Sequence, residues 1–158
     1  MTEIPDLLER YRRGAELLAV VLTGVYGEEE DFQPAPGKWS TKQVMGHLCD
    51  GERVLAYRVL RFARGDEKEL HGYEQDDYVR EAGSNSRTLD DLLAEFESVR
   101  KATLALFGSL PPGVETRSGV ANGNPITVRA IAYIMAGHTL HHYELLKAQL
   151  RGKATQAS

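Results

Sequence analysis

The chain has 158 residues, of which 42% are hydrophobic and 27% are charged, so it is long enough to build one domain and too short for two. Its net charge is −4 at pH 7, and the basic excess typical of a nucleic-acid-binding surface is absent. The single cysteine, Cys49, excludes an internal disulfide, and no apolar run approaches the roughly 20 residues of a membrane span. These features predict a cytoplasmic protein with neither a nucleic-acid nor a membrane partner.

Apolar residues recur with helical spacing along most of the chain, and no segment alternates as a half-buried strand does. The first apolar face runs from Ile4 to Leu22, and the acidic, Gly- and Pro-containing run 27–37 ends this helix. Ser40 followed by Gln43 forms a capping box, which predicts a second helix that continues to about Ala63.

A third helix is predicted from Thr88 to the Pro111–Pro112 pair, which cannot continue it. After a loop rich in Gly and Asn, Thr127 is a suitable cap for a fourth helix that reaches about Leu150. Residues 1–150 are therefore expected to form one domain, and residues 151–158 a flexible polar tail.

The fold class predicted from four long helices is all-α, a four-helix bundle. The connection from Gly65 to Arg87 is longer than most links between bundle helices, and it can span the full length of a helix when extended. This length favours parallel second and third helices and an up-down-down-up order. A simple up-and-down bundle with a long loop is the alternative.

Three of the five histidines fall within five residues of the fourth helix: His138, His141 and His142. On a helical wheel, His142 lies about 40° from His138 and His141 about 60° to the other side. His138 and His142 share the centre of the core-facing apolar stripe, which also carries Ile134 and Leu145. His47 points inward from the second helix. Buried imidazoles need partners, because an unsatisfied polar group costs about 1–3 kcal/mol.

One divalent cation would satisfy His47, His138 and His142 together, since two histidines four positions apart on a helix form a good metal clamp. In the up-down-down-up order, the second and fourth helices are antiparallel and all three residues lie at a similar depth. The alternative, three histidines that only pack in the core, stays open at this point. Cys49 faces away from His47, and His71 is expected to be exposed to solvent.

Several stretches of the chain resemble the DinB-like (damage-inducible) superfamily of four-helix proteins, and the ordered His…His-x-x-x-His pattern is the most specific of them. The similar stretches cover nearly the whole chain: residues 36–48 with Asp50 and Glu52, residues 72–78, 85–92, 126–131 and 137–146.

This resemblance implies an up-down-down-up bundle with a metal triad at His47, His138 and His142. It further implies zinc, nickel or a related divalent ion as the cofactor, and a low-molecular-weight thiol such as bacillithiol or mycothiol as a reactant. Thiol-dependent S-transfer is the function that we expect. A metal-assisted hydrolase, a non-catalytic metal- or ligand-binding stress-response bundle and a purely structural dimer are the alternatives.

Around the triad, Asp50 and His141 are candidate hydrogen-bond partners of the ligands, and Arg58 is a candidate for an ion pair with a buried acid. The candidates for the lining of a small-molecule pocket come from the loops at the end where the second helix starts: Trp39, Tyr73, Tyr78 and Asn85.

A second apolar stripe on the fourth helix predicts a homodimer through the outer face of that helix, because a helix apolar on two sides is buried on two sides. Its residues are Ala132, Tyr133, Ala136, Leu140 and Tyr143.

Overall fold

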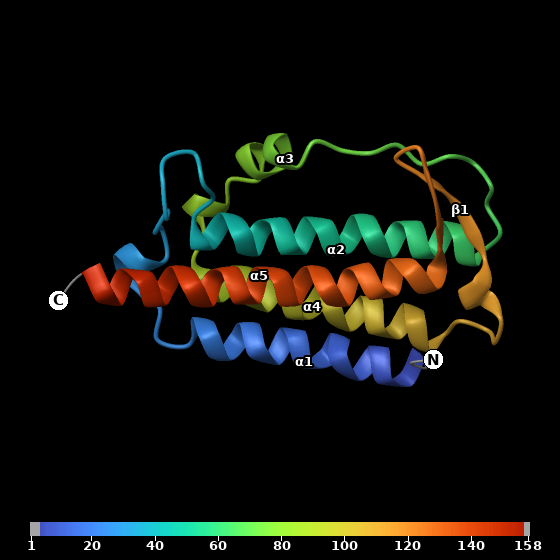
Figure 1. Cartoon of the computed structure of the whole chain (residues 1–158), viewed down its shortest axis with the longest axis horizontal. Coiled ribbons are helices and arrows are strands. Elements are labelled where there is room, and N and C mark those ends of the chain that lie inside the picture. Colours follow the sequence, from blue (N-terminus) through green and yellow to red (C-terminus); the bar gives the residue numbers. More distant parts are fainter. Residues whose placement is uncertain (1–3, 157–158) are drawn as a thin grey trace.

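The computed structural model describes the backbone of residues 4–156 and the side chains of residues 6–152. Four long helices lie side by side along the long axis of the molecule (Figure 1). They are α1 (Ile4–Leu22), α2 (Thr41–Ala63), α4 (Leu89–Gly108) and α5 (Val128–Gln156). The predicted four-helix bundle is confirmed.

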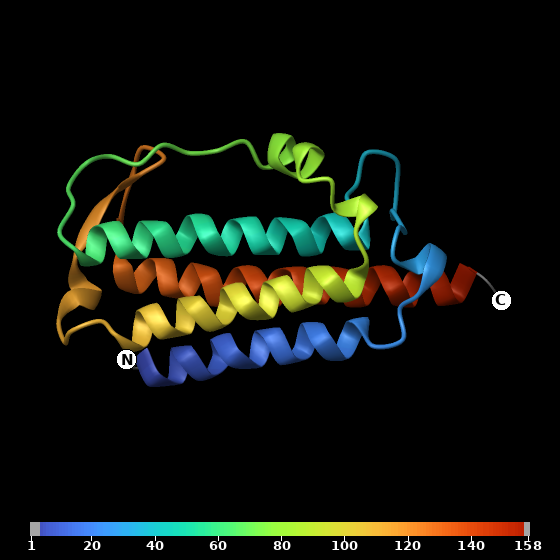
Figure 2. The same ribbon diagram turned by 180° about the vertical axis from the view of Figure 1, so that it is seen from behind.

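The helices follow one another in the up-down-down-up order. Helices α2 and α4 run in the same direction, whereas α1 and α5 run in the opposite one, as Figures 1 and 2 both show. The long connection between α2 and α4 passes along the outside of α2 and contains the short helix α3 (Gln75–Glu81) and a 3₁₀ turn (Ser84–Ser86). The parallel second and third helices predicted from the length of this connection are therefore confirmed.

Local signals set the starts of three helices. The Ser40 hydroxyl accepts a hydrogen bond from the Gln43 backbone N–H at 3.1 Å, and the Gln43 side chain accepts one from the Ser40 N–H at 2.9 Å. The Thr88 and Thr127 hydroxyls accept from backbone N–H groups in the first turns of α4 and α5. All three predicted caps are confirmed. Each satisfies a donor that a helix leaves unpaired at its start.

Helix α5 ends later than predicted, at Gln156 instead of about Leu150. The predicted tail thus begins inside the helix, and its last residues, 157 and 158, lie outside the described residues. The flexibility of residues 151–158 stays a prediction.

A β-hairpin stands where the sequence indicated a loop, so the expectation of a chain without strands was wrong. Strand β1 (Ser118–Ala121) pairs antiparallel with β2 (Asn124–Thr127). The turn residues Asn122 and Gly123 have φ angles of 52° and 73°, the left-handed conformation that an Asn-Gly hairpin turn requires. The Leu70 N–H donates to the Val120 carbonyl at 2.9 Å, so the hairpin holds the start of the connection against the end of the bundle.

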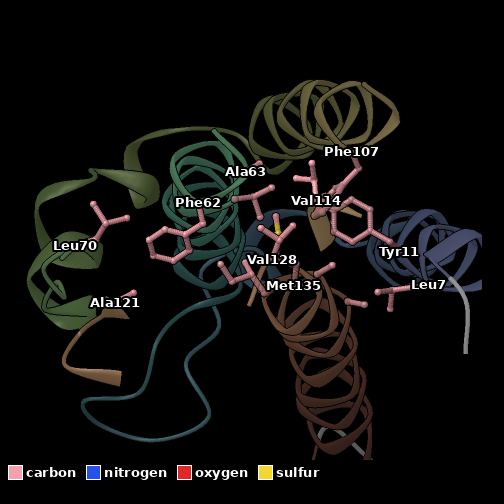
Figure 3. Close-up of a cluster of buried hydrophobic side chains, with 14 residues drawn as sticks. Leu7, Tyr11, Phe62, Ala63, Leu70, Phe107, Val114, Ala121, Val128 and Met135 are labelled. Atoms are coloured by element: carbon pink, nitrogen blue, oxygen red, sulfur yellow. The ribbon is translucent and has the colours of Figure 1, made fainter. Parts of the chain in front are cut away.

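The apolar core consists of two clusters at different heights of the bundle. The first cluster lies near the hairpin and includes Tyr11, Phe62, Phe107 and Met135 (Figure 3). The second cluster lies towards the start of α2 and includes Leu18, Met45, Phe96 and Leu146. On three of the four long helices, buried polar residues stand between the two clusters: Glu52 on α2, Arg100 and Thr103 on α4, and Thr139 on α5. We call these four residues the polar layer.

Helix α5 packs against both α1 and α2, which gives its second apolar stripe neighbours within the same chain. Ala132 and Ala136 are buried, and Thr139 Cγ2 lies 3.1 Å from the position that a Cβ at Gly14 of α1 would take. Tyr133 of the same predicted stripe is 40% exposed. Burial within the chain thus accounts for Ala132 and Ala136 without a partner chain, and the homodimer stays a prediction.

Within residues 4–156, no helix is both long and apolar enough to cross a bilayer.

Candidate metal centre

The side chains of His47, His138 and His142 meet between α2 and α5. Each offers one ring nitrogen, and these three nitrogens lie within 4.8 Å of one another. The Nε2 atoms of His47 and His138 are 2.9 Å apart, and the ring centroids of the three pairs are separated by 4.7–5.0 Å. The three side chains that were expected to meet are therefore close together, and their role as metal ligands stays a prediction.

The cluster follows from the antiparallel run of α2 and α5. A Cβ at Gly51 would lie 3.1 Å from His138 Cε1, so glycine leaves the space that the His138 ring occupies. One turn earlier on α2 is His47, and one turn later on α5 is His142. Because the helices run in opposite directions, these two steps lead to the same place.

The environment keeps the three imidazoles neutral. Burial, reinforced by the neighbouring His138, lowers the pKa of His47 to about 4. Burial and the neighbouring histidines lower the pKa of His142 to about 3, and burial also lowers the pKa of His138. A neutral imidazole is the form that binds a metal ion. His142 Nδ1 is also buried without a hydrogen-bond partner among the described residues, so this donor set fits a divalent cation.

The cluster opens on one side. Ile134 and Leu145, which the wheel placed on the core-facing stripe, are 47% and 43% exposed. The expectation that they face the core was wrong, because α5 turns this edge towards solvent beside His138. The histidines thus lie at the rim of the core, where a small molecule can reach them.

Trp39 forms one wall of the cluster, as expected for a pocket residue. Its ring centroid lies 4.7 Å from that of His47 and 6.4 Å from that of His142, nearly parallel to the latter. The indole N–H donates to Asp76 of α3 at 3.1 Å. A pocket of about 640 Å³ extends from here along α5, and Trp39, Asp76, His142, Leu145 and Gln149 are among the residues that line it.

The other predicted pocket residues come from the connection between α2 and α4. The Tyr73 ring lies 4.7 Å from the Tyr78 ring, and the Tyr73 hydroxyl lies 3.7 Å from the position of a Cβ at Gly51, so Tyr73 approaches the His138 ring. Tyr78 is 47% exposed. Asn85 accepts a hydrogen bond from the Ser40 hydroxyl at 2.6 Å. This bond ties the connection to the start of α2, and Asn85 is not among the residues that line the pocket.

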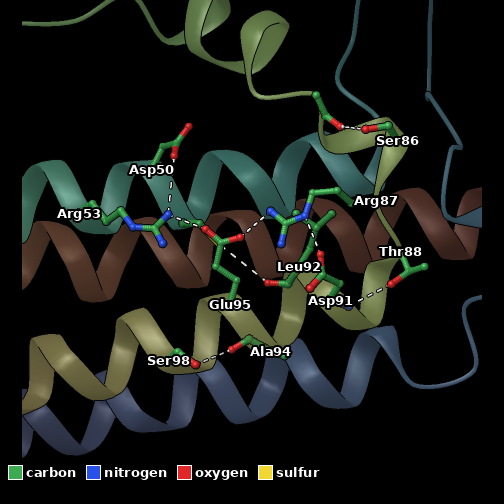
Figure 4. A network of polar contacts seen from close by, with 12 residues as sticks. Asp50, Arg53, Ser86, Arg87, Thr88, Asp91, Leu92, Ala94, Glu95 and Ser98 are labelled. Atoms are coloured by element: carbon green, nitrogen blue, oxygen red, sulfur yellow. Dashed lines mark hydrogen bonds and ion pairs between the residues drawn. The ribbon is translucent and has the colours of Figure 1, made fainter.

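Asp50 was a candidate hydrogen-bond partner of the ligands, and no such bond is found among the described residues. Its carboxylate faces Arg53 at 4.0 Å, at the edge of an ion-pair network in which Glu95 joins Arg53 to Arg87 (Figure 4). Asp50 lies about 60° from His47 on the helical wheel, and its role beside the ligands stays a prediction.

Arg58 forms no ion pair with a carboxylate among the described residues. Instead, its guanidinium donates to the His71 carbonyl at 3.3 Å, so the predicted ion pair was wrong and Arg58 supports the connection. His141 is exposed, and its ring lies 5.2 Å from that of His142. His71 is exposed and Cys49 is buried, its thiol directed at the Leu92 carbonyl, as their positions on the sequence suggested.

The sequence reading missed a buried ion pair behind the cluster. Glu52 and Arg100 are each 3% exposed, and they form two hydrogen bonds of 3.0 Å. A signal was present in the sequence of α4. One apolar face of this helix continues through Phe96, Arg100, Thr103 and Phe107, and a charged residue on such a face needs a buried partner.

Three neutral imidazoles leave a coordination position for a further ligand, as catalytic zinc sites do. A cation held there would lower the pKa of a bound thiol or water by its charge. The arrangement is therefore suited to activating a nucleophile next to the pocket.

We expect the metal-free protein to lose stability as the pH falls below about 6.5, the pKa of an ordinary histidine. In that range the unfolded chain takes up protons that folded His47 and His142, with pKa values of about 4 and 3, do not. The loss should reach at most about 1.4 kcal/mol per pH unit for each histidine and should stop near the folded-state pKa values. Urea unfolding at pH 7.5, 6.5 and 5.5 measures it. His142→Gln should flatten the dependence, and parallel curves for both proteins would contradict this origin.

Comparisons with known proteins agree with the observed fold. A family model described as the DinB superfamily matches residues 10–146. YfiT from Bacillus subtilis, described as a probable metal-dependent hydrolase with an unusual four-helix bundle topology, is 17% identical and superposes with a TM-score of 0.83 over 98% of this chain and 91% of its own.

Two further solved structures share the fold. The mycothiol-dependent maleylpyruvate isomerase is 13% identical, with a TM-score of 0.74 over 90% of this chain and 60% of its own. A DinB-like protein, YjoA from Bacillus subtilis, is 16% identical, with a TM-score of 0.67 over 94% of this chain and 91% of its own. At these identities the likeness establishes the fold alone. A search among curated proteins found no match.

Proposed function

The chain belongs to the DinB superfamily, and on this premise we propose that it is a metal-dependent enzyme of thiol-dependent S-transfer. His47, His138 and His142 would hold one divalent ion, with zinc and nickel as the first candidates because imidazole suits both. The observation that carries the proposal is the convergence of three ring nitrogens within 4.8 Å beside an open pocket. The reducing cytoplasm, where low-molecular-weight thiols are kept reduced, is the proposed place of action.

The ion would supply the positive charge that favours a thiolate over a thiol at neutral pH. The chain's own residues provide the rest. The histidines stay neutral through burial and direct their nitrogens to one point. Trp39 covers the His47 ring, and Asp76 fixes the indole through its N–H. The pocket along α5 has room for a small electrophile. Sulfur would form a bond to its carbon as the leaving group departs with the electron pair and the thiol proton passes to solvent.

Hydrolysis is the second candidate, because the same open position can activate water and the neighbour YfiT is described as a probable metal-dependent hydrolase. A non-catalytic binder would use the same three histidines without turnover. Assays of the metal-loaded protein distinguish the three: a thiol with an activated electrophile, an ester panel without thiol, and metal retention in the absence of either reaction.

The first test is elemental analysis of tag-free protein in three forms: wild type, His138→Ala and His141→Ala. His141 is the matched control, because it lies on the same helix but is exposed. About one equivalent of a transition metal is expected in wild type and His141→Ala, and none in His138→Ala. No bound metal in wild type after incubation with zinc or nickel would overturn the proposal.

A further inference from the structure

We infer that Arg100 is a positioning residue for the candidate metal centre and that, through Glu52 and Thr139, it sets the alignment of α2 and α5 where the histidines meet. The inference rests on the proposed metal site. Glu52, Arg100 and Thr139 do not line the pocket beside the histidines. Arg100 carries a buried charge in the middle of the bundle.

One guanidinium joins all four long helices. From α4, Arg100 donates two hydrogen bonds of 3.0 Å to the Glu52 carboxylate on α2. Its Nη2 also donates to the Thr139 hydroxyl on α5, and its Nη1 donates to the Tyr11 carbonyl on α1, each at 2.6 Å. The Tyr11 ring lies 3.5 Å from the guanidinium carbon. Because the donors form a rigid planar fork, these contacts fix the helices relative to one another.

This junction lies directly behind the histidines. Glu52 follows Gly51, the residue that faces the His138 ring at the 3.1 Å approach described above. Thr139 follows His138 in the chain. The two residues on which Arg100 acts are therefore the immediate chain neighbours of a facing pair in the cluster. His47 and His142 are one helical turn away, about 6 Å along the axis.

Stability alone is a poor reason for this junction. Glu52, Arg100 and Thr139 are at most 3% exposed, and removing two charges from water costs several kcal/mol that their attraction often fails to exceed. Apolar side chains of similar size would extend the two clusters above and below the polar layer without that cost. What they would not provide is a fixed register, and functional groups must be held to within about 0.5 Å.

The test compares two double variants that each remove an ion pair between α2 and α4. Glu52→Leu/Arg100→Met removes the junction and keeps its volume apolar. Arg53→Met/Glu95→Leu is the control: it removes the partly exposed pair of Figure 4, whose arginine side chain is 51% exposed. Among the described residues, the other ion-pair partners of this pair are Asp50 on α2 and Arg87 at the end of the connection, and neither lies on α5. The zinc affinity of metal-depleted protein and the absorption spectrum of the cobalt(II) form are measured for both.

We expect the Glu52/Arg100 variant to bind zinc 10–100-fold more weakly, as residues that orient metal ligands typically do when replaced, and to show an altered cobalt spectrum at unchanged thermal stability. The control should remain within twofold of wild type in affinity, with the same spectrum. A Glu52/Arg100 variant that is folded and binds zinc like the control would overturn the inference.

Thr139→Val keeps the shape of the side chain and removes the contact of Arg100 with α5, together with the hydrogen bond of the hydroxyl to the Met135 carbonyl on its own helix. It is the second variant, used if the double variant does not fold. The same weakening of zinc binding is expected, by about tenfold, and an unchanged affinity would overturn the inference.

Imidazole ¹⁵N–¹H spectra of the metal-free proteins separate this inference from the proposed function. The His47 and His138 signals should shift in Thr139→Val and not in the Arg53/Glu95 control, even if wild type binds no metal. Unchanged signals there would overturn the positioning role.

Discussion

Replacing Arg100 alone by methionine is expected to lower the free energy of unfolding by about 3–5 kcal/mol, because it leaves the Glu52 carboxylate buried without its partner. Glu52 is 3% exposed, and water cannot take over the two hydrogen bonds that it loses. For a domain of this size the change should lower the melting temperature by roughly 6–20 °C. Urea unfolding and thermal scans measure both quantities.

The cost of Arg100→Met should depend on pH in a defined direction. Burial already raises the pKa of Glu52, and Arg100 is the first group that opposes this rise. Without Arg100, the folded protein favours the protonated carboxyl, so stability is retained at low pH and lost as the pH rises through the new pKa. The loss should therefore be larger at pH 8 than at pH 5. Arg53→Met, at an exposed ion pair, should cost less than about 1 kcal/mol. A cost of that size for Arg100→Met at pH 8 would contradict the role assigned to the pair.

Zinc at about a thousand times its dissociation constant is expected to stabilise the folded wild-type protein by about 4 kcal/mol, since only the folded chain brings the three histidines together. This corresponds to a rise in melting temperature of roughly 8–16 °C. His138→Ala should abolish the rise, and His141→Ala should keep it. Differential scanning fluorimetry with metal-depleted protein measures the shift.

Magnesium is the matched control ion for this shift. It prefers oxygen ligands and octahedral geometry, so it should leave the melting temperature of wild type unchanged. A zinc shift of equal size in wild type and His138→Ala would mean that zinc binds elsewhere on the chain.

The fold could be predicted from local signals and one length. Ser40, Thr88 and Thr127 mark helix starts through hydrogen bonds within a single turn, and such signals need no knowledge of distant residues. The length of the Gly65–Arg87 connection was enough to indicate parallel helices. The hairpin was missed because its strands have four residues each, too few for alternation to appear. The Asn122–Gly123 turn was the signal to follow.

The histidine cluster could be predicted because its three members lie on apolar stripes, where a polar ring is conspicuous. Its surroundings could not, since they depend on which helix lies opposite. Asp50 looked available to His47, but its carboxylate faces Arg53 on the same helix, which pairs with Glu95 of α4. The Glu52–Arg100 pair depends on contacts between residues 48 positions apart, and a single helix face does not encode its partner. The exposure of Ile134 and Leu145 likewise reflects the rotation of α5 against its neighbours.

The three histidines are synthesised at different times, because one lies on α2 and the other two lie on α5. His47 leaves the ribosome long before His138, which follows 91 positions later. A nascent chain that lacks the last helix therefore carries one of the three ring nitrogens, too few to hold an ion firmly. Loading of the proposed metal site would therefore come late in folding, after α5 has docked between α1 and α2. An ion bound there would tie α2 to α5 and close a long loop, so that occupancy of the site would report whether these two helices have packed correctly.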